Sequence, residues 1–402
     1  MVKPAVLRVL AITKIFPNAA EPLSAPFNRQ QFAALARRCE LTVMATLPWF
    51  PGAGLLSRWS SAGKLASVPR REEIEGIPVS HPRTLFVPRL AHGAWGPLYA
   101  ASIAPAVLRY RGKVDVVLGS WAYPDGFAAV IAAQMLQVPC VVKLHGSDIN
   151  IIAKLPGPRR LTAWALPRAA RVVAVSRALA DEVVALGVPR ERVAIVMNGV
   201  DADLFHPADR AAARAELGLP AGPLAVYVGN LKPEKGVLDL ARAWADVPRG
   251  TLAIVGGGPA RAALEEAAAP LGDRVRIAGP QPLASIPRWM AACDVLVLPS
   301  HAEGTPNVIL EALACGRRVV ATNVGGIPDL LVRPELGAMV PPRDPPALAA
   351  ALTAALEAPY DPAEIARLGA RGGWEASAAA LHAVLAEAAT GSGTGGGTRS
   401  GN

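Results

Sequence analysis

The feature that most constrains this chain is an alternation of short apolar runs with helical patterns, which occurs in two successive series along 402 residues. Short apolar runs that are separated by helices are typical of parallel strands buried on both faces of a sheet. Two such series predict an α/β chain of two doubly wound, Rossmann-like domains that face each other across a cleft. In such domains ligands bind at the carboxyl ends of the strands, so functional residues are sought there.

The predicted elements divide the chain near residue 200. The first series has strand candidates at 7–13, 41–46, 114–120, 140–146 and 171–176, and helix candidates at 27–38, 124–136 and 177–186. The second series has strand candidates at 224–230, 251–258, 275–279, 293–300 and 317–322, and helix candidates at 259–272 and 344–357. The run at 193–207 ends in a polar loop, which is typical of a domain boundary. We therefore predict three parts: a domain of residues 1–200 completed by a helix at 374–389, a domain of residues 205–373, and a disordered Gly-rich tail at 390–402.

Composition narrows the classes of partner. Hydrophobic residues make up 52% of the chain, and 41 basic against 32 acidic side chains give a formal net charge of +9. The basic residues are scattered and not interleaved with aromatic residues, which predicts no nucleic-acid partner. The histidines share no ligand spacing, which predicts no metal site. The cysteines also lack the spacing of metal ligands. They are interpreted as buried reduced thiols, which suit a cytosol. They are Cys39, Cys140, Cys293 and Cys315.

The chain shows no sign of membrane insertion. It has no uninterrupted apolar segment of about 20 residues. Its first apolar run is broken by Arg8 and reads as a strand rather than as a signal peptide. Both features favour a cytoplasmic protein.

One region, residues 48–113, departs from the alternation and is rich in proline, glycine, tryptophan and arginine. Its side chains could form a membrane-surface patch, or its aromatic residues could pack on the first domain as a long surface insertion. We favour the insertion because no sustained helical periodicity is visible. A membrane patch would use Trp49, Phe50, Leu55, Leu56, Trp59 and Lys64.

The stretch 299–326 predicts an anion site. After a strand candidate, Thr305 can cap a helix and Pro306 suits its first position. Unpaired N–H groups and the positive dipole end make such a helix start a binding site for phosphate. Glu303 and Glu311 bracket this start, and eight residues at helical rise would separate them by about 12 Å. The plainer alternative is a strand–helix unit with one exposed glutamate at each end.

Three further groups follow other predicted strands. Lys235 lies in a loop before a helix, where it can meet a diphosphate as a point charge, although a solvated loop lysine is commoner. The glycines at 256–258 form a tight strand-to-helix turn without GxGxxG spacing, so no nicotinamide cofactor is predicted. A lone histidine usually has a structural role. Because His145 lies at a carboxyl strand end of the first series, we give a functional role equal weight.

With these residues in view, the second half resembles the retaining, sugar-nucleotide-dependent glycosyltransferases of family 4, which have the GT-B fold. The resemblance is carried by the E-x7-E arrangement of Glu303 and Glu311 within PSHAEGTPNVILEALACGRRVVATNVGGIPDLL. The segments VGNLKPEKG, VGGGP, VSRALADEV and VMNGVDADLF also match in order and spacing. It covers nearly the whole chain and is strongest over residues 170–345.

The resemblance implies a role for each matching residue. Among the catalytic residues, Lys235 would hold the donor diphosphate, Glu303 would lie near the donor sugar, and His145 would approach that sugar from the first domain. Glu311 would accept hydrogen bonds from the ribose hydroxyls. Charge builds on the leaving diphosphate, so a lysine and N–H groups aimed there stabilise it without demanding a metal or other cofactor. The remaining donor-binding positions are Gly304, Thr305, Asn307, Asn230, Gly257, Gly258 and Pro280.

Two positions depart from the family pattern. Asn230 stands where the family usually has an arginine, so a guanidinium is missing. Similar branches among polysaccharide-synthesis enzymes also carry asparagine there. Ala25 stands where a glycine commonly lies near the donor diphosphate, which puts the role of that first loop in doubt.

We therefore predict a retaining glycosyltransferase of the hexosyltransferase type. It would move a sugar from a nucleotide-diphosphate-sugar to a glycan or lipid-linked acceptor, in cell-surface polysaccharide synthesis. The content of residues 48–113 favours an acceptor near the inner face of the membrane and a peripheral membrane contact. Two alternatives stay open: a nucleotide-sugar epimerase on the same fold, and a non-catalytic nucleotide-sugar-binding protein.

Overall fold

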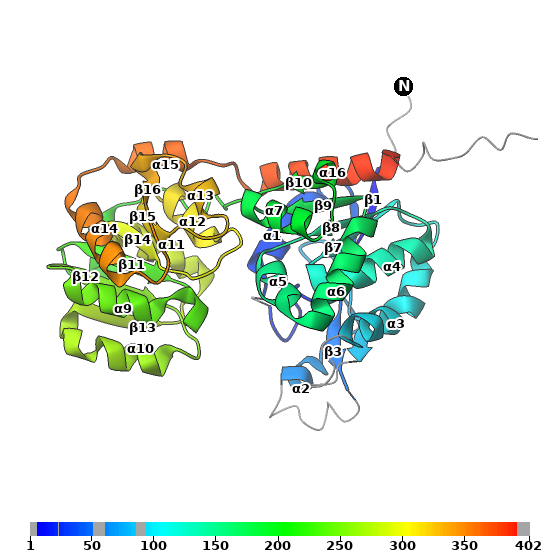
Figure 1. The fold of residues 1–402 in the computed structure, drawn as a ribbon, viewed down its shortest axis with the longest axis horizontal. Coiled ribbons are helices and arrows are strands. Elements are labelled where there is room, and N and C mark those ends of the chain that lie inside the picture. Colours follow the sequence, from blue (N-terminus) through cyan, green and yellow to red (C-terminus); the bar gives the residue numbers. More distant parts are fainter. Residues whose placement is uncertain (1–5, 23, 51–60, 86–93, 392–402) are drawn as a thin grey trace, which may run out of the picture. The chain divides into compact units, whose positions relative to one another are not determined.

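Two large sheets, one in each of two units, organise the chain (Figure 1). This computed structural model describes residues 6–22, 24–50, 61–85 and 94–391. Unit 1 contains the chain up to Asn198 and again from Trp374, and unit 2 runs from Gly199 to Gly373. The chain therefore leaves unit 1 once and returns to it for its last helix.

The sheet of unit 1 has eight strands in the order β10-β9-β8-β7-β1-β2-β5-β4. All neighbours pair in parallel except β4 and β5, which form an antiparallel hairpin at one edge. These strands are β1 Arg8–Thr13, β2 Glu40–Ala45, β4 Arg71–Ile74, β5 Ile77–Ser80, β7 Val116–Ser120, β8 Cys140–Lys143, β9 Arg171–Ala174 and β10 Val193–Ile195. A separate parallel pair is formed by β3 Leu47–Trp49 and β6 Arg83–Leu85.

Helices cover both faces of this sheet, as a doubly wound fold requires. Along β1, Leu10 and Ile12 enter one hydrophobic core, while Val9 and Ala11 enter another on the opposite face. The last helix, red in Figure 1, packs against α1, and its Ser377 accepts a hydrogen bond from Gln31 at 2.8 Å. The helices are α1 Pro26–Ala36, α2 Ser61–Leu65, α3 Trp95–Val107, α4 Phe127–Leu136, α5 Ser147–Asn150, α6 Pro156–Ala165, α7 Arg177–Ala185 and α16 Trp374–Gly391.

Unit 2 has a six-stranded parallel sheet in the order β13-β12-β11-β14-β15-β16. The strands are β11 Leu224–Val228, β12 Thr251–Val255, β13 Val275–Gly279, β14 Val295–Leu298, β15 Arg318–Thr322 and β16 Gly337–Val340. The helices are α8 Arg210–Leu217, α9 Val237–Asp246, α10 Arg261–Ala268, α11 Ile286–Ala292, α12 Asn307–Ala314, α13 Ile327–Leu330, α14 Pro345–Glu357 and α15 Pro362–Gly369. The predicted class, α/β with two Rossmann-like halves, is confirmed.

Several predicted boundaries are wrong. The helix expected from residue 124 begins at Phe127, because residues 122–126 form a wide turn. The irregular region 48–113 supplies the β4–β5 hairpin, β6 and α3, so much of it belongs to the domain itself.

The residues of the alternative membrane patch fall only partly within the described residues. Trp49 is 41% exposed, whereas Leu47, Leu65 and Val68 form a small buried cluster. Leu55, Leu56 and Trp59 lie outside the described residues, as do positions 392–402 of the predicted tail. No helix of the described part has the length and apolar character needed to cross a bilayer. The four cysteines are free and buried, as predicted.

Candidate functional site

The loops at the carboxyl edge of the unit 2 sheet bind one another through their backbones. In the loop after β11, the Leu231 N–H donates a hydrogen bond of 2.9 Å to the Gly257 carbonyl, which lies in the loop after β12. The Glu234 carbonyl of the same loop accepts a hydrogen bond of 2.8 Å from the His301 N–H, which lies in the loop after β14. Gly236 has φ 65°, and a Cβ there would fall 2.0 Å from the Pro299 carbonyl oxygen. Only glycine permits this approach, so these loops hold their side chains in fixed positions.

Two of the predicted catalytic residues meet at this edge. Lys235 Nζ lies 2.7 Å from Glu303 Oε1, and Ser300 Oγ donates to the same oxygen at 2.6 Å. Glu303 is almost fully buried, whereas the Lys235 side chain is a quarter exposed. A buried carboxylate with a charged partner and a hydroxyl donor is firmly oriented. The cluster thus fixes a cation that keeps one side toward solvent.

The helix start differs in detail from the prediction. Thr305 was expected to cap it, but Pro306 is the N-cap, with ψ 112°, and α12 begins at Asn307. Because only residues 307–311 have helical rise, the predicted 12 Å separation of the two glutamates does not follow. Gly304 lies in the preceding turn, and its carbonyl accepts from Gly326 N–H at 2.7 Å. The predicted phosphate-binding segment is therefore held by the loop after β15.

Glu311 lies on α12 and differs sharply from Glu303. It is half-buried, and its carboxyl group makes no hydrogen bond or ion pair with the residues that the structure describes. Loss of water around this group raises the pKa of Glu311 to about 7. An acidic group without a partner at such a position is a candidate ligand contact.

This pKa predicts that nucleotide binding depends on pH. If the carboxylate accepts hydrogen bonds from ribose hydroxyls, binding favours the ionised form, which falls to about a tenth of the protein at pH 6. Affinity for a nucleoside diphosphate should then be about tenfold lower at pH 6 than at pH 8. Calorimetric titrations measure the affinity at each pH. The Glu311→Gln variant is the control, because its pH dependence reports the titration of the phosphates alone. Parallel pH profiles for the two proteins would exclude this role.

The remaining donor-site candidates of unit 2 lie on adjoining loops. Gly257 is next to Pro280, because a Cβ on Gly257 would lie 3.6 Å from that ring. Asn230 is exposed, and its carbonyl accepts from Tyr227 Oη at 2.9 Å. A Cβ on Gly258 would fall 2.4 Å from the Leu231 carbonyl oxygen, so this glycine serves loop packing first.

In unit 1, His145 lies in a defined hydrogen-bond network after β8. Asn28 donates to the Ile15 carbonyl at 2.8 Å, which turns its amide oxygen toward Ser120 Oγ, 3.2 Å away. Ser120 therefore donates to Asn28 and accepts from His145 Nε2 at 2.9 Å. Burial, and then nearby Lys143, lower the pKa of His145 well below its usual range. A neutral imidazole with a protonated Nε2 presents Nδ1 as an acceptor.

The segment beside His145 was missed by the sequence reasoning. Trp121 stacks on His145 with ring centroids 5.8 Å apart, and its backbone has φ 126°. A non-glycine residue in that region carries strain, which is commonest at functional sites. Asp125 is fully buried, accepts from Tyr99 Oη at 3.0 Å, and leaves Oδ2 without a partner among the described residues. Trp-Ala-Tyr-Pro-Asp-Gly directly after a strand was the available signal.

The Ala25 departure has a structural counterpart. Ala25 precedes α1 with φ 44° and ψ 55°, the left-handed conformation that glycine adopts at no steric cost. The position therefore demands a turn that favours glycine, and alanine makes the same turn.

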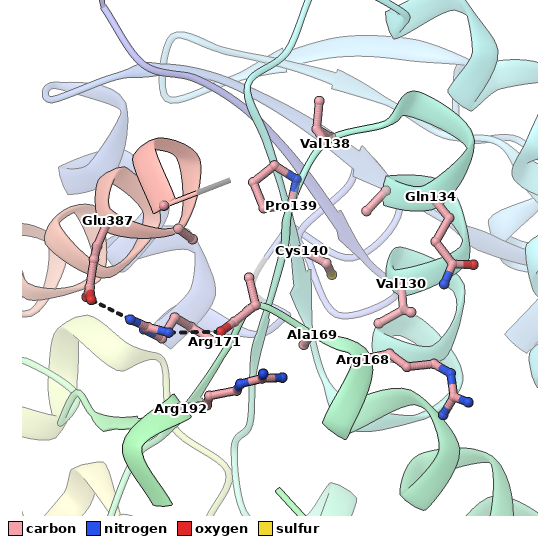
Figure 2. Close-up of a pocket in the computed structure, with 14 residues that line it drawn as sticks. Val130, Gln134, Val138, Pro139, Cys140, Arg168, Ala169, Arg171, Arg192 and Glu387 are labelled. Carbon is pink, nitrogen blue, oxygen red and sulfur yellow. Dashed lines mark hydrogen bonds and ion pairs between the residues drawn. The ribbon is translucent and has the colours of Figure 1, made fainter. Parts of the chain in front are cut away.

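Another pocket of unit 1 lies away from these residues (Figure 2). It has a volume of about 420 Å³ and is lined by the amino ends of β8 and β9, opposite the edge that carries His145. Arg171 pairs with Glu387 there. None of the predicted site residues lines it. Within the described residues, no three or more His, Cys, Asp or Glu side chains are grouped to hold a metal ion.

Two family models match the chain, over separate ranges of residues. A family model described as Glycosyltransferase Family 4 matches residues 33–204, and one described as Glycosyl transferases group 1 matches residues 222–358. A Bacillus subtilis (strain 168) protein that bears the name teichuronic acid biosynthesis glycosyltransferase TuaC is 30% identical, over 86% of this chain and 88% of its own length. A D-inositol 3-phosphate glycosyltransferase of Thermobispora bispora is 39% identical over 50% of this chain and 51% of its own length. The solved structure of Anabaena Alr3699/HepE in complex with UDP has a TM-score of 0.71 at 22% identity, covering 96% of this chain and 100% of that one.

Proposed function

Because this chain belongs to the family 4, group 1 glycosyltransferases, we propose that it transfers a sugar from a nucleotide-diphosphate-sugar with retention of the anomeric configuration. The observation that carries the donor class is the cluster of Lys235, Glu303 and Ser300 beside the start of α12. A lysine and backbone N–H groups at one strand edge suit a diphosphate leaving group. Solved structures of the similar HepE protein, in complex with UDP and with UDP-glucose, support the same class.

Each unit has a part in this proposal. In unit 2, Lys235 neutralises charge on the leaving diphosphate, Glu311 binds the ribose, and Glu303 lies near the transferred sugar. These cationic and N–H groups act without a divalent metal. Unit 1 binds the acceptor substrate. There, Nδ1 of His145 accepts a hydrogen bond from a sugar hydroxyl. The acceptor is a glycan or lipid-linked glycan of cell-surface polysaccharide synthesis, as the name of the TuaC relative suggests, and the enzyme acts at the cytoplasmic face.

The decisive experiment is a thermal-shift screen of the full chain against nucleotide sugars, in buffer containing EDTA. The correct donor at 100 times its dissociation constant should stabilise the protein by about 2.7 kcal/mol. Incubation with that donor and acceptor candidates, followed by NMR of the product, then gives the anomeric configuration. No shift with any donor would refute the donor class, and a new epimer from donor alone would assign an epimerase.

A further inference from the structure

A second hollow of unit 1 lies between α3 and the β4–β5 hairpin. Its volume is about 1130 Å³, which exceeds the roughly 300–1,000 Å³ of an ordinary small-molecule pocket. Pro105 and Ala106 of α3 form part of one wall, and Val79 of β5 also lines it. We call it the basic groove, after the five cations that line it: Arg70, Arg71, Arg83, Arg109 and Lys113.

The charges of the basic groove are poorly balanced by the protein itself. Its lining has two carboxylates, and that of Glu72 lies 2.5 Å from His81 Nε2. Four of its cations are exposed and make no side-chain hydrogen bond or ion pair with the described residues: Arg70, Arg71, Arg109 and Lys113. Like charges gathered in one hollow repel each other unless an anion lies between them.

Arg83 differs from the other four because it is held in place. It is half-buried, and Nη2 donates to the carbonyls of Ala66 at 3.2 Å and Val68 at 2.5 Å. Its Nη1 is buried without a partner among the described residues. Burial, and then the charge of Arg70, lower the pKa of Arg83. Its guanidinium therefore adds a positionally fixed positive charge to the lining of the groove.

The three arginines that line the pocket of Figure 2 each have a hydrogen-bond or ion-pair partner on the protein. Arg168 donates to the Trp164 carbonyl at 2.7 Å, Arg192 to the Pro167 carbonyl at 3.3 Å, and Arg171 pairs with Glu387. Every arginine there has a protein partner. Of these two cationic hollows, the basic groove is therefore the one with cations whose side chains lack a hydrogen-bond or ion-pair partner among the described residues.

The basic groove also has a direction. It begins at residues 80–83, at the carboxyl edge of the sheet that also carries His145, and extends to Arg109 and Lys113, which precede β7. Since residues 78–80 of β5 line it, the groove extends about 10 Å beside this strand. An elongated hollow with apolar walls and cations suits an extended acidic chain better than the flat surface of a bilayer.

We infer that the basic groove binds a carboxylate-bearing glycan chain, as the growing end or the body of an acidic polysaccharide acceptor. This inference rests on the proposed glycosyltransferase function for its acceptor role. It assigns the acceptor class, which the comparisons leave open. Carboxylates spaced along the chain would pair with the groove cations, while sugar faces lie on Pro105, Ala106 and Tyr110.

The test compares two variants of equal charge in the full chain. Arg71→Glu/Arg109→Glu reverses two groove cations, and Arg159→Glu/Arg160→Glu reverses two exposed cations on α6. Binding of oligogalacturonates, of neutral malto-oligosaccharides of matched length, and of phosphatidylglycerol vesicles is measured for each protein. We expect oligogalacturonate to bind wild type and the α6 variant alike, and the groove variant at least about tenfold more weakly.

Three outcomes would overturn the inference. They are equal weakening in both variants, equal binding of neutral oligosaccharides, and a groove effect on vesicles alone, which would assign the groove to lipid headgroups. The donor-induced thermal shift is measured on the same proteins. It should be equal for wild type, the groove variant and the α6 variant. Its absence from wild type would refute the proposed donor while leaving binding of the acidic chain to be judged on its own.

Discussion

Replacing Lys235 by alanine is expected to lower the rate of sugar transfer by about 100- to 1,000-fold, the usual effect of removing one group that stabilises transition-state charge. Its ammonium lies 2.7 Å from Glu303 Oε1 and remains a quarter exposed. An incoming diphosphate can therefore share this cation with the buried carboxylate. Without it, both the leaving group and Glu303 lose their positive neighbour. Initial rates at saturating donor and acceptor measure the effect.

The control lies in the same loop. Lys232 is exposed, and its side chain makes no hydrogen bond or ion pair with the described residues. Lys232→Ala should therefore leave the rate within about twofold, because a solvated charge outside the cluster contributes little. A double variant of Lys235→Ala with Glu303→Gln should lose less than the product of the single losses, since the two side chains act as a pair. Equal losses for Lys232 and Lys235 would remove Lys235 from its assigned role.

Apolar periodicity predicted most of the fold because it reports burial directly. The alternating cores on either side of β1 are the structural form of the pattern that predicted a sheet buried on both faces. The β4–β5 hairpin was missed because Arg71–Ile74 has alternating exposure on an edge strand, without an apolar run. Thr305 was taken as a cap because threonine is a common N-cap, whereas Pro306 takes that position in an extended conformation.

The candidate site was predictable residue by residue but not as a set of contacts. Strand ends placed Lys235 and Glu303 at one sheet edge, yet the 2.7 Å ion pair depends on how their two loops pack. That packing is decided by backbone approaches that leave no mark on hydrophobic periodicity. Trp121 was missed for a related reason, since a positive φ at a tryptophan runs against its own preference.

Gly256→Ala is expected to destabilise unit 2 by about 3 kcal/mol, the upper end for overpacking, and to lower the unfolding temperature by about 6–12 °C. A Cβ on Gly256 would fall 1.8 Å from the Gly229 carbonyl oxygen. That neighbour is backbone and cannot rotate away, so the loop after β11 must move. Lys235 lies at the end of this loop, and donor affinity should fall together with stability. Thermal unfolding and nucleotide titration of the full chain measure the two effects.

Gly257→Ala provides the matched control, and it separates packing from ligand contact. A Cβ on Gly257 would lie 3.6 Å from Pro280, an ordinary contact, so the variant should unfold within a few degrees of wild type. If Gly257 also lets the donor approach the backbone, as the family resemblance implies, this variant should lose donor affinity at unchanged stability. Unchanged affinity would restrict the glycine turn to loop packing. If Gly256→Ala unfolded like wild type, loop packing by that glycine would not be what positions Lys235.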